Sequence, residues 1–171
     1  MGKVQEKFLD EFAKVFCKKA PNVAWNGGQI KNNMARFSKY LAERRENTHE
    51  KSERFELGDL TTDFKGHKIV IEFDSSGVAI SNLLKYWPYL RGELSVEPKL
   101  PIVICHFSNW SSYGAYRDLW QWTLHQIQQD AQCRHQISGR LFDHWGNDHL
   151  LRSHSIAQAV DWVLDQLKSG N

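Results

Sequence analysis

The sequence predicts an α/β domain in which a mixed β-sheet is flanked by helices. Three observations support this fold class: an amphipathic helix pattern at 3–19, a hairpin pattern at 58–74 and a continuous apolar run at 102–107. The expected order is helix, strand, hairpin of two strands, helix and buried strand, or α-β-β-β-α-β. The 171 residues suit a single domain, 1–171, that can bury a core.

The N-terminal part of the chain is expected to form two helices and a short strand. Residues 3–19 carry an apolar stripe with charges between its members, and residues 29–47 carry a second. The charged end of the second helix, with Glu43 and Glu46, is typical of a solvated face. The alternatives are that one of these acids reaches a metal, or that the arginines between them touch phosphate. Residues 53–57 fit a short strand.

The hairpin at 58–74 is organised around Lys65-Gly66, its only internal turn signal. A two-residue turn there places Phe64 opposite His67 and, counting back, Asp59 opposite Glu72. Lysine fits poorly at the first position of such a turn, which requires a positive φ. Because strand side chains alternate between faces, Ile69, Ile71 and Phe73 form a core face, whereas Glu72 and Asp74 share the other side.

Asp59, Glu72 and Asp74 are therefore expected to form a cluster of carboxylates on one side of the hairpin. Directly opposed residues have Cβ atoms roughly 5 Å apart, so that like charges repel one another. Such a cluster favours a divalent cation with oxygen ligands, Mg²⁺ or Mn²⁺. The alternative is a solvated face whose acids have no chemical role. Asp63 fits that alternative, because pairing with Lys68 explains it.

The remaining elements follow from apolar patterns bounded by polar residues: a helix at 78–90, a strand buried on both faces at 102–107, a helix at 113–130, a short strand at 135–142 and a helix at 155–168. Pro88 is expected to shorten the first of these helices, and Ser155 to cap the last. Residues 143–153 are expected to form a loop. The Trp-rich helix at 113–130 faces either the core or a partner subunit.

Composition restricts the class of protein. The chain has 25% charged and 41% hydrophobic residues and a net charge of +2, which is typical of a soluble globular protein and does not by itself indicate nucleic-acid binding. Cys17, Cys105 and Cys133 are far apart and form no CxxC, which favours a reducing compartment over disulfides or zinc. With neither an apolar leader nor an apolar run of about 18 residues, a cytoplasmic location without membrane association is expected.

Two short motifs, Gly58-Asp59 and Glu72-Phe73-Asp74, resemble the PD-(D/E)XK nuclease superfamily, which includes restriction endonucleases and Holliday-junction resolvases. In that superfamily an aspartate opens the second core strand and a (D/E)-x-K tripeptide lies on the third. The resemblance covers residues 30–107 and implies a restriction endonuclease-like core. It implies that Asp59 and Glu72 are metal ligands, and that Asp74 is a third ligand or helps to deprotonate water.

Asp74 stands where the superfamily has its lysine. A lysine on the following helix sometimes substitutes for it, and Lys85 is placed to do so, on a face shared with Asn82. The resemblance then implies that Lys85 neutralises charge during the reaction. An ordinary solvated lysine is the alternative. Glu56, near the Leu57-Gly58 corner, is a further candidate ligand whose alternative is a surface position.

The expected function is that of a metal-dependent nuclease-like protein that hydrolyses phosphodiester bonds in DNA. The catalytic candidates are Asp59, Glu72, Asp74 and Lys85, with the first three holding Mg²⁺ or Mn²⁺. A homodimer is expected if both strands of a duplex are cut. The alternative is a catalytically inactive module of the same fold that binds nucleic acid or another partner, which Asp74 and the near-neutral charge favour.

Overall fold

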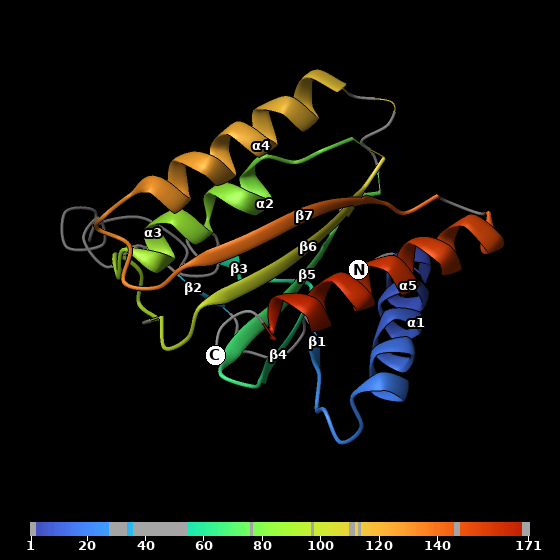
Figure 1. Ribbon diagram of the computed structural model, residues 1–171. Coiled ribbons are helices and arrows are strands. Elements are labelled where there is room, and N and C mark those ends of the chain that lie inside the picture. Colours follow the sequence, from blue (N-terminus) through green and yellow to red (C-terminus); the bar gives the residue numbers. More distant parts are fainter. Residues whose placement is uncertain are drawn as a thin grey trace, which may run out of the picture.

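The computed structural model describes residues 3–27, 34–35, 55–75, 77–96, 98–109, 112, 114–145 and 148–168. In these ranges a five-stranded sheet lies between two layers of helices, so the α/β class with a mixed, helix-flanked sheet is confirmed (Figure 1). The strands, in spatial order, are β1 (Asn26–Gly27), β4 (Leu60–Phe64), β5 (His67–Phe73), β6 (Ile102–Ser108) and β7 (Ile137–Asp143).

Strand direction changes at the middle of the sheet. Strands β1, β4 and β5 pair antiparallel, whereas β5, β6 and β7 pair parallel. Parallel neighbours need crossover connections, and helices supply them between β5 and β6 and between β6 and β7. Without the separate strands β2 and β3, the chain order is α1, β1, β4, β5, the helices after β5 and then β6, so that α1 and β1 take the places expected for the helix at 29–47 and the strand at 53–57.

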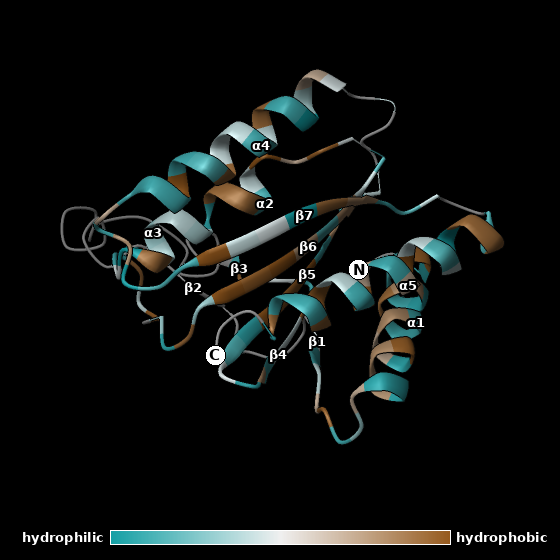
Figure 2. Ribbon diagram, in the orientation of Figure 1, coloured by the Kyte–Doolittle hydropathy of each residue, from teal (hydrophilic) through white to brown (hydrophobic). Residues whose placement is uncertain are grey.

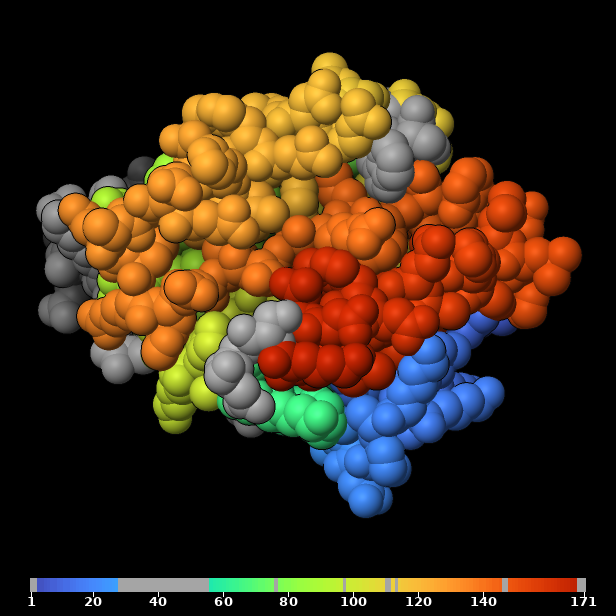
Figure 3. Space-filling view, in the orientation of Figure 1, coloured from blue at the N-terminus to red at the C-terminus, as the bar shows by residue number. Residues whose placement is uncertain are grey.

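Helices cover both faces of the sheet. Helices α1 (Lys3–Lys19) and α5 (His149–Gln166) pack against each other on one face, where they adjoin in the space-filling view (Figure 3). The other face carries two short helices, α2 (Ser81–Leu84) and α3 (Tyr86–Leu90), together with the longer α4 (Gly114–Gln129). Strand β6 is hydrophobic over most of its length, as its position between these layers requires (Figure 2).

Strand β5 contributes to a core on each face of the sheet. Ile69, Ile71 and Phe73 pack toward α1 and α5, as the alternation predicts. Val70 packs in the second core, with α2, α3 and α4. Glu72 lies on this second side and is only 1% exposed. The alternative that Glu72 lies on a solvated face of the hairpin is therefore wrong, because helices cover both sides of the strand.

The region before the hairpin differs from the expectation. Within the predicted helix 29–47, Met34–Ala35 forms strand β2, which pairs with β3 (Phe55–Glu56) in a separate two-stranded sheet. The rest of that predicted helix, with Glu43 and Glu46, lies outside the described residues. The strand expected at 53–57 is thus present at 55–56, but the strand that joins the main sheet is β1. Apolar spacing alone does not distinguish a helix from strand segments that pair at a distance.

Two helix predictions also need correction. The helix expected at 78–90 is divided at Lys85, which lies in a turn between α2 and α3. The last helix begins at His149 and not at Ser155, because Asp148 caps it by accepting a hydrogen bond from the Leu151 N–H at 3.0 Å. Ser155 lies inside this helix, and its hydroxyl donates to the Asp143 carbonyl. Within the described part of the chain, no helix is both long and apolar enough to cross a membrane.

Candidate functional site

The hairpin has the register that the sequence predicts. Phe64 pairs with His67, and the ladder continues to Leu60 opposite Ile71. Lys65 has a φ of 48° and Gly66 a φ of 75°, so both central residues have the positive φ of a type I′ turn. The turn thus holds a lysine in the left-handed region, and the register of the whole hairpin follows from it.

Asp59 is held beside the end of β5 by its backbone and its side chain. Gly58 has a φ of +91°, and a Cβ there would lie 2.6 Å from Cγ2 of Thr61, so only glycine fits this corner. Beyond it, the Asp59 N–H donates to the Ile71 carbonyl at 3.0 Å. The Asp59 Oδ2 accepts from the Phe73 N–H at 2.8 Å. These bonds place the Asp59 carboxylate next to Glu72.

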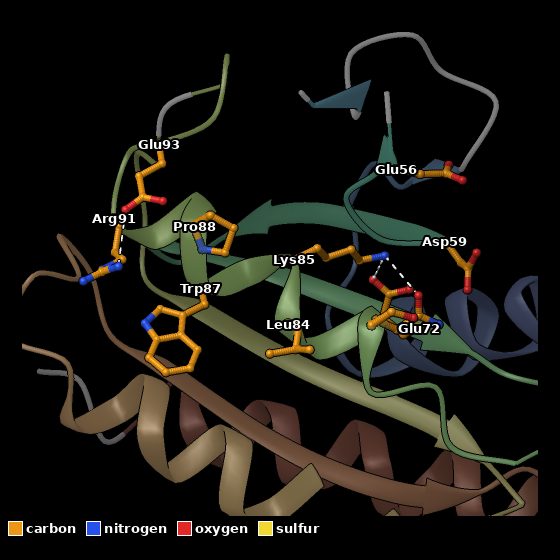
Figure 4. A pocket seen from close by; sticks show the side chains of 11 residues that line it. Glu56, Asp59, Glu72, Leu84, Lys85, Trp87, Pro88, Arg91 and Glu93 are labelled. Carbon is orange, nitrogen blue, oxygen red and sulfur yellow. Dashed lines mark hydrogen bonds and ion pairs between the residues drawn. The ribbon is translucent and has the colours of Figure 1, made fainter. Parts of the chain in front are cut away.

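Glu72 is bound by two groups from the helical segment after β5. The Lys85 Nζ lies 2.8 Å from Glu72 Oε1, and the Tyr86 hydroxyl donates to the same oxygen. Lys85 extends from the turn between α2 and α3 toward Glu72 and Asp59 (Figure 4). Lys85 therefore lies at the acid cluster, as predicted. The alternative, an ordinary lysine side chain in solvent, does not agree with this contact.

Burial and mutual repulsion raise the pKa values of these acids. Burial, more than the neighbouring Asp59, raises the pKa of Glu72 from 4.5 to about 7, against the opposing effect of Lys85. Burial also raises the pKa of Asp59, with a smaller contribution from Asp74. The pKa of Glu56 is raised by burial and then by Asp59. Burial therefore disfavours the charged forms of these carboxylates, and a cation beside them would favour those forms.

These side chains line a cavity of about 780 Å³ (Figure 4). Its lining residues are Glu56, Asp59, Glu72, Ser81, Asn82, Leu84, Lys85, Trp87, Pro88, Arg91 and Glu93. Three of the four predicted site residues, Asp59, Glu72 and Lys85, are therefore brought together. Glu56 joins them, and its buried Oε1 has no hydrogen-bond partner among the described residues.

Asp74 has a different place from the one predicted. It is not one of the described residues that line the cavity. Its Oδ2 accepts from the Ala79 N–H at 2.7 Å and bonds to the His106 Nε2 at 2.6 Å, while its Oδ1 accepts from the Asn82 amide at 2.8 Å. Asp74 thus joins the end of β5 to the start of α2. Because Asp74 makes these bonds and does not line the cavity with Asp59 and Glu72, the described residues do not present it as a third metal ligand.

His106 extends this network into the core. The Trp120 indole N–H donates to the His106 Nδ1 at 2.9 Å, so that this nitrogen carries no proton. The N–H of His106 is therefore on Nε2, and it donates to Asp74. His106 is fully buried. Its sequence signal is a single polar residue inside an apolar strand, but nothing in the sequence identifies Trp120 as its partner.

The donor set fits a hard cation that keeps part of its water. In the described ranges, no three His, Cys, Asp or Glu side chains are grouped so that they could hold a metal by themselves. Mg²⁺, however, is commonly bound by one or two carboxylates and completes its shell with water and phosphate oxygens. Asp59 and Glu72 supply two such carboxylates, and Glu56 lies nearby with an oxygen that no described residue contacts by a hydrogen bond. No protein-family model, curated protein or solved structure matches this chain.

Proposed function

We propose that the cavity is the active site of a metal-dependent nuclease that hydrolyses phosphodiester bonds, with DNA as the expected substrate. The observation that carries this proposal is the convergence of Asp59, Glu72 and Lys85 on one cavity, although they come from three separate segments. The PD-(D/E)XK resemblance supports it, because an aspartate, a glutamate and a displaced lysine are the groups that it implies.

The carboxylate oxygens of Asp59 and Glu72 would hold Mg²⁺ or Mn²⁺. When bound, the metal would supply charge stabilisation for the phosphate and a water of lowered pKa. The Lys85 ammonium, 2.8 Å from Glu72, would neutralise negative charge that develops on the phosphate. Asp74 has a positioning role, since it fixes Asn82, whose side-chain oxygen lies 3.5 Å from the Lys85 Nζ.

The charge of the cavity makes substrate binding depend on a cation. Its ionisable lining consists of four acids and two bases: Glu56, Asp59, Glu72, Glu93, Lys85 and Arg91. With all of them ionised, the lining carries a formal charge of −2, which repels an anionic phosphodiester. One divalent cation offsets this charge, so we expect nucleic acid to enter the cavity only together with a metal.

Nicking of supercoiled plasmid in Mg²⁺ or Mn²⁺ tests the proposal. We expect metal-dependent nicking by the wild-type protein and its loss in Glu72→Gln and Asp59→Asn, with far-UV circular dichroism unchanged. Asp63→Asn is the matched control, because Asp63 lies on the same hairpin but pairs with Lys68 at the surface. Equal nicking by Glu72→Gln and the wild type would place the activity elsewhere.

Thermal unfolding in the presence of metal gives a readout that does not need turnover. A ligand that binds only the folded state stabilises it by about 2.7 kcal/mol at a concentration 100 times its Kd. Since the metal needs ionised carboxylates and the pKa of Glu72 is about 7, the increase in Tm should be larger at pH 8 than at pH 5.5. An identical Tm with EDTA and with 10 mM Mg²⁺ at pH 8 would contradict a metal site.

A nucleic-acid-binding module without catalysis is the second candidate. The observation that favours it is Asp74, which occupies the position of the superfamily's lysine and has both oxygens engaged in structural hydrogen bonds. Metal-dependent binding of DNA without nicking by the wild-type protein would support this candidate over the nuclease.

A further inference from the structure

The cavity extends well beyond the acid cluster. A water molecule takes about 30 Å³ of the liquid, so a cation with six waters needs roughly 200 Å³. The cavity, at about 780 Å³, is several times larger and falls in the range of small-molecule sites. Asp59 and Glu72 lie at one end, and Arg91 and Glu93 lie at the other (Figure 4). A hydrated cation at the acid cluster would therefore fill only part of the cavity and leave the space toward Arg91 and Glu93 open to a second group.

An apolar wall lines this space. Leu84, Trp87, Pro88 and Arg91 follow the spacing i, i+3, i+4, i+7, so they share one side of the α2–α3 segment, and all four line the cavity. The core side of the same segment is formed by other residues: Leu83, Tyr86, Tyr89 and Leu90. Leu84 remains 44% exposed. Trp87 packs partly against this core as well, so core packing accounts for part of the wall but not for the exposed Leu84.

Trp87 is held in place at one edge of its ring. Its indole N–H donates to the Asp130 Oδ2 at 2.6 Å, and the Arg91 Nε lies 2.9 Å from the same oxygen. Both contacts are made at the edge of the indole or beyond it, which leaves the ring system in the cavity wall fixed in orientation. A fixed aromatic surface beside Pro88 is a platform on which a flat ring can stack at little cost in side-chain entropy.

We propose that this wall binds an unpaired nucleobase next to the phosphodiester held at the acid cluster, so that the substrate is single-stranded nucleic acid or an unpaired segment of a duplex. The inference rests on the proposed function, because the cation at Asp59 and Glu72 fixes where the phosphate lies. The occupant must combine a flat, largely apolar group with an adjacent anion, and a nucleotide does so. In an intact duplex the base faces are stacked on one another and cannot reach Trp87.

Fluorescence anisotropy of labelled oligonucleotides tests this subsite in Ca²⁺, which occupies oxygen sites and is used here to limit turnover. The probes are a single-stranded thymidine 12-mer, an abasic 12-mer with the same phosphates, and a 12-base-pair duplex. We expect the thymidine strand to bind at least tenfold more tightly than the other two. Trp87→Leu should weaken thymidine binding on the order of 5- to 150-fold, the effect of losing one stacked base.

Three further variants separate the loss of the apolar wall from a general loss of folding. Trp87→Phe keeps an aromatic ring and should retain most of the affinity. Leu84→Asp, at an exposed position of the wall, should weaken binding of the thymidine strand without lowering Tm by more than a few degrees. Trp122→Leu is the control, because Trp122 is 58% exposed on α4 and is not one of the described lining residues.

The outcomes distinguish failure of the subsite from failure of the nuclease. Base-dependent, Trp87-dependent binding without nicking in Mg²⁺ would support the subsite and overturn the nuclease. Nicking that Glu72→Gln abolishes, together with equal binding of the thymidine and abasic strands, would overturn the subsite alone. A preference for the duplex, or full affinity in both Trp87→Leu and Leu84→Asp, would also overturn it.

Discussion

Replacing Glu72 by glutamine should stabilise the metal-free protein at alkaline pH. The pKa of Glu72 is about 7 in the folded protein against 4.5 ordinarily, and each pH unit of that difference corresponds to about 1.4 kcal/mol. The folded state therefore holds a proton that the unfolded chain has released. The stabilisation that this proton gives the folded state is complete below pH 4.5 and is lost as the pH rises through 7. The free energy of unfolding of the wild type therefore falls by about 3 kcal/mol over this range. Glutamine mimics the protonated acid and can still accept hydrogen bonds from Lys85 and Tyr86.

Urea unfolding followed by far-UV circular dichroism in EDTA, at pH 5 and at pH 8, measures this difference. Glu72→Gln should exceed the wild type by about 3 kcal/mol at pH 8, or roughly 6–12 °C in Tm for a chain of this size, and by much less at pH 5. Asp63→Asn should differ from the wild type by less than about 1 kcal/mol at either pH, because its ion pair with Lys68 is exposed. Equal stability of Glu72→Gln and the wild type at pH 8 would refute the argument that burial of this carboxyl is costly.

Three further substitutions examine the elements that hold the site. Gly58→Ala should destabilise the fold by at least 1–3 kcal/mol in chemical unfolding, because it adds strain at positive φ and a clash with Thr61; unchanged stability would show that the corner can relax. Lys65→Asn should stabilise the hairpin by about 0.5 kcal/mol, since asparagine tolerates a positive φ better than lysine does, and a lower urea midpoint would contradict this. Trp120→Phe should cost about 3 kcal/mol or more, because it removes ring volume and leaves the buried His106 Nδ1 without its donor; a loss below 1 kcal/mol would show that this hydrogen bond adds little.

The central part of the site could be predicted from local sequence because its geometry is local. The Lys65-Gly66 turn fixes the register, and the register places Asp59 beside Glu72. The place of Lys85 was predicted from the family resemblance together with the helical spacing that it shares with Asn82, although the helix itself is divided at Lys85. In each case the relevant atoms are connected by fewer than thirty residues of chain.

The role of Asp74 could not be predicted in the same way. Alternation places it on the side of Glu72, but β5 ends at Phe73, and alternation has no meaning beyond the end of a strand. Its partners Ala79 and Asn82 lie in the next segment, and His106 lies on the neighbouring strand. Side-chain hydrogen bonds between distant segments leave no periodic pattern in a sequence.

The apolar wall could not be predicted from the sequence either, for a related reason. Leu84 and Trp87 lie three residues apart, and apolar residues at such a helical spacing usually face a core. The structure gives that role mainly to Leu83, Tyr86 and Leu90, and Trp87 is only partly buried against the same core. An apolar stripe in a sequence does not reveal whether it faces a protein core or a cavity, because the residue types are the same.

The position of Glu72 within the sheet has a consequence for how the site can move. Strand β5 is hydrogen-bonded to β4 on one edge and to β6 on the other, and its amides from Val70 to Glu72 are therefore expected to exchange with deuterated solvent only when the whole domain unfolds. The floor of the cavity is thus rigid on the timescale of ligand entry. Among the described lining residues, adjustment of the backbone to a ligand is therefore expected in the α2–α3 segment, which the turn at Lys85 divides into two short helices.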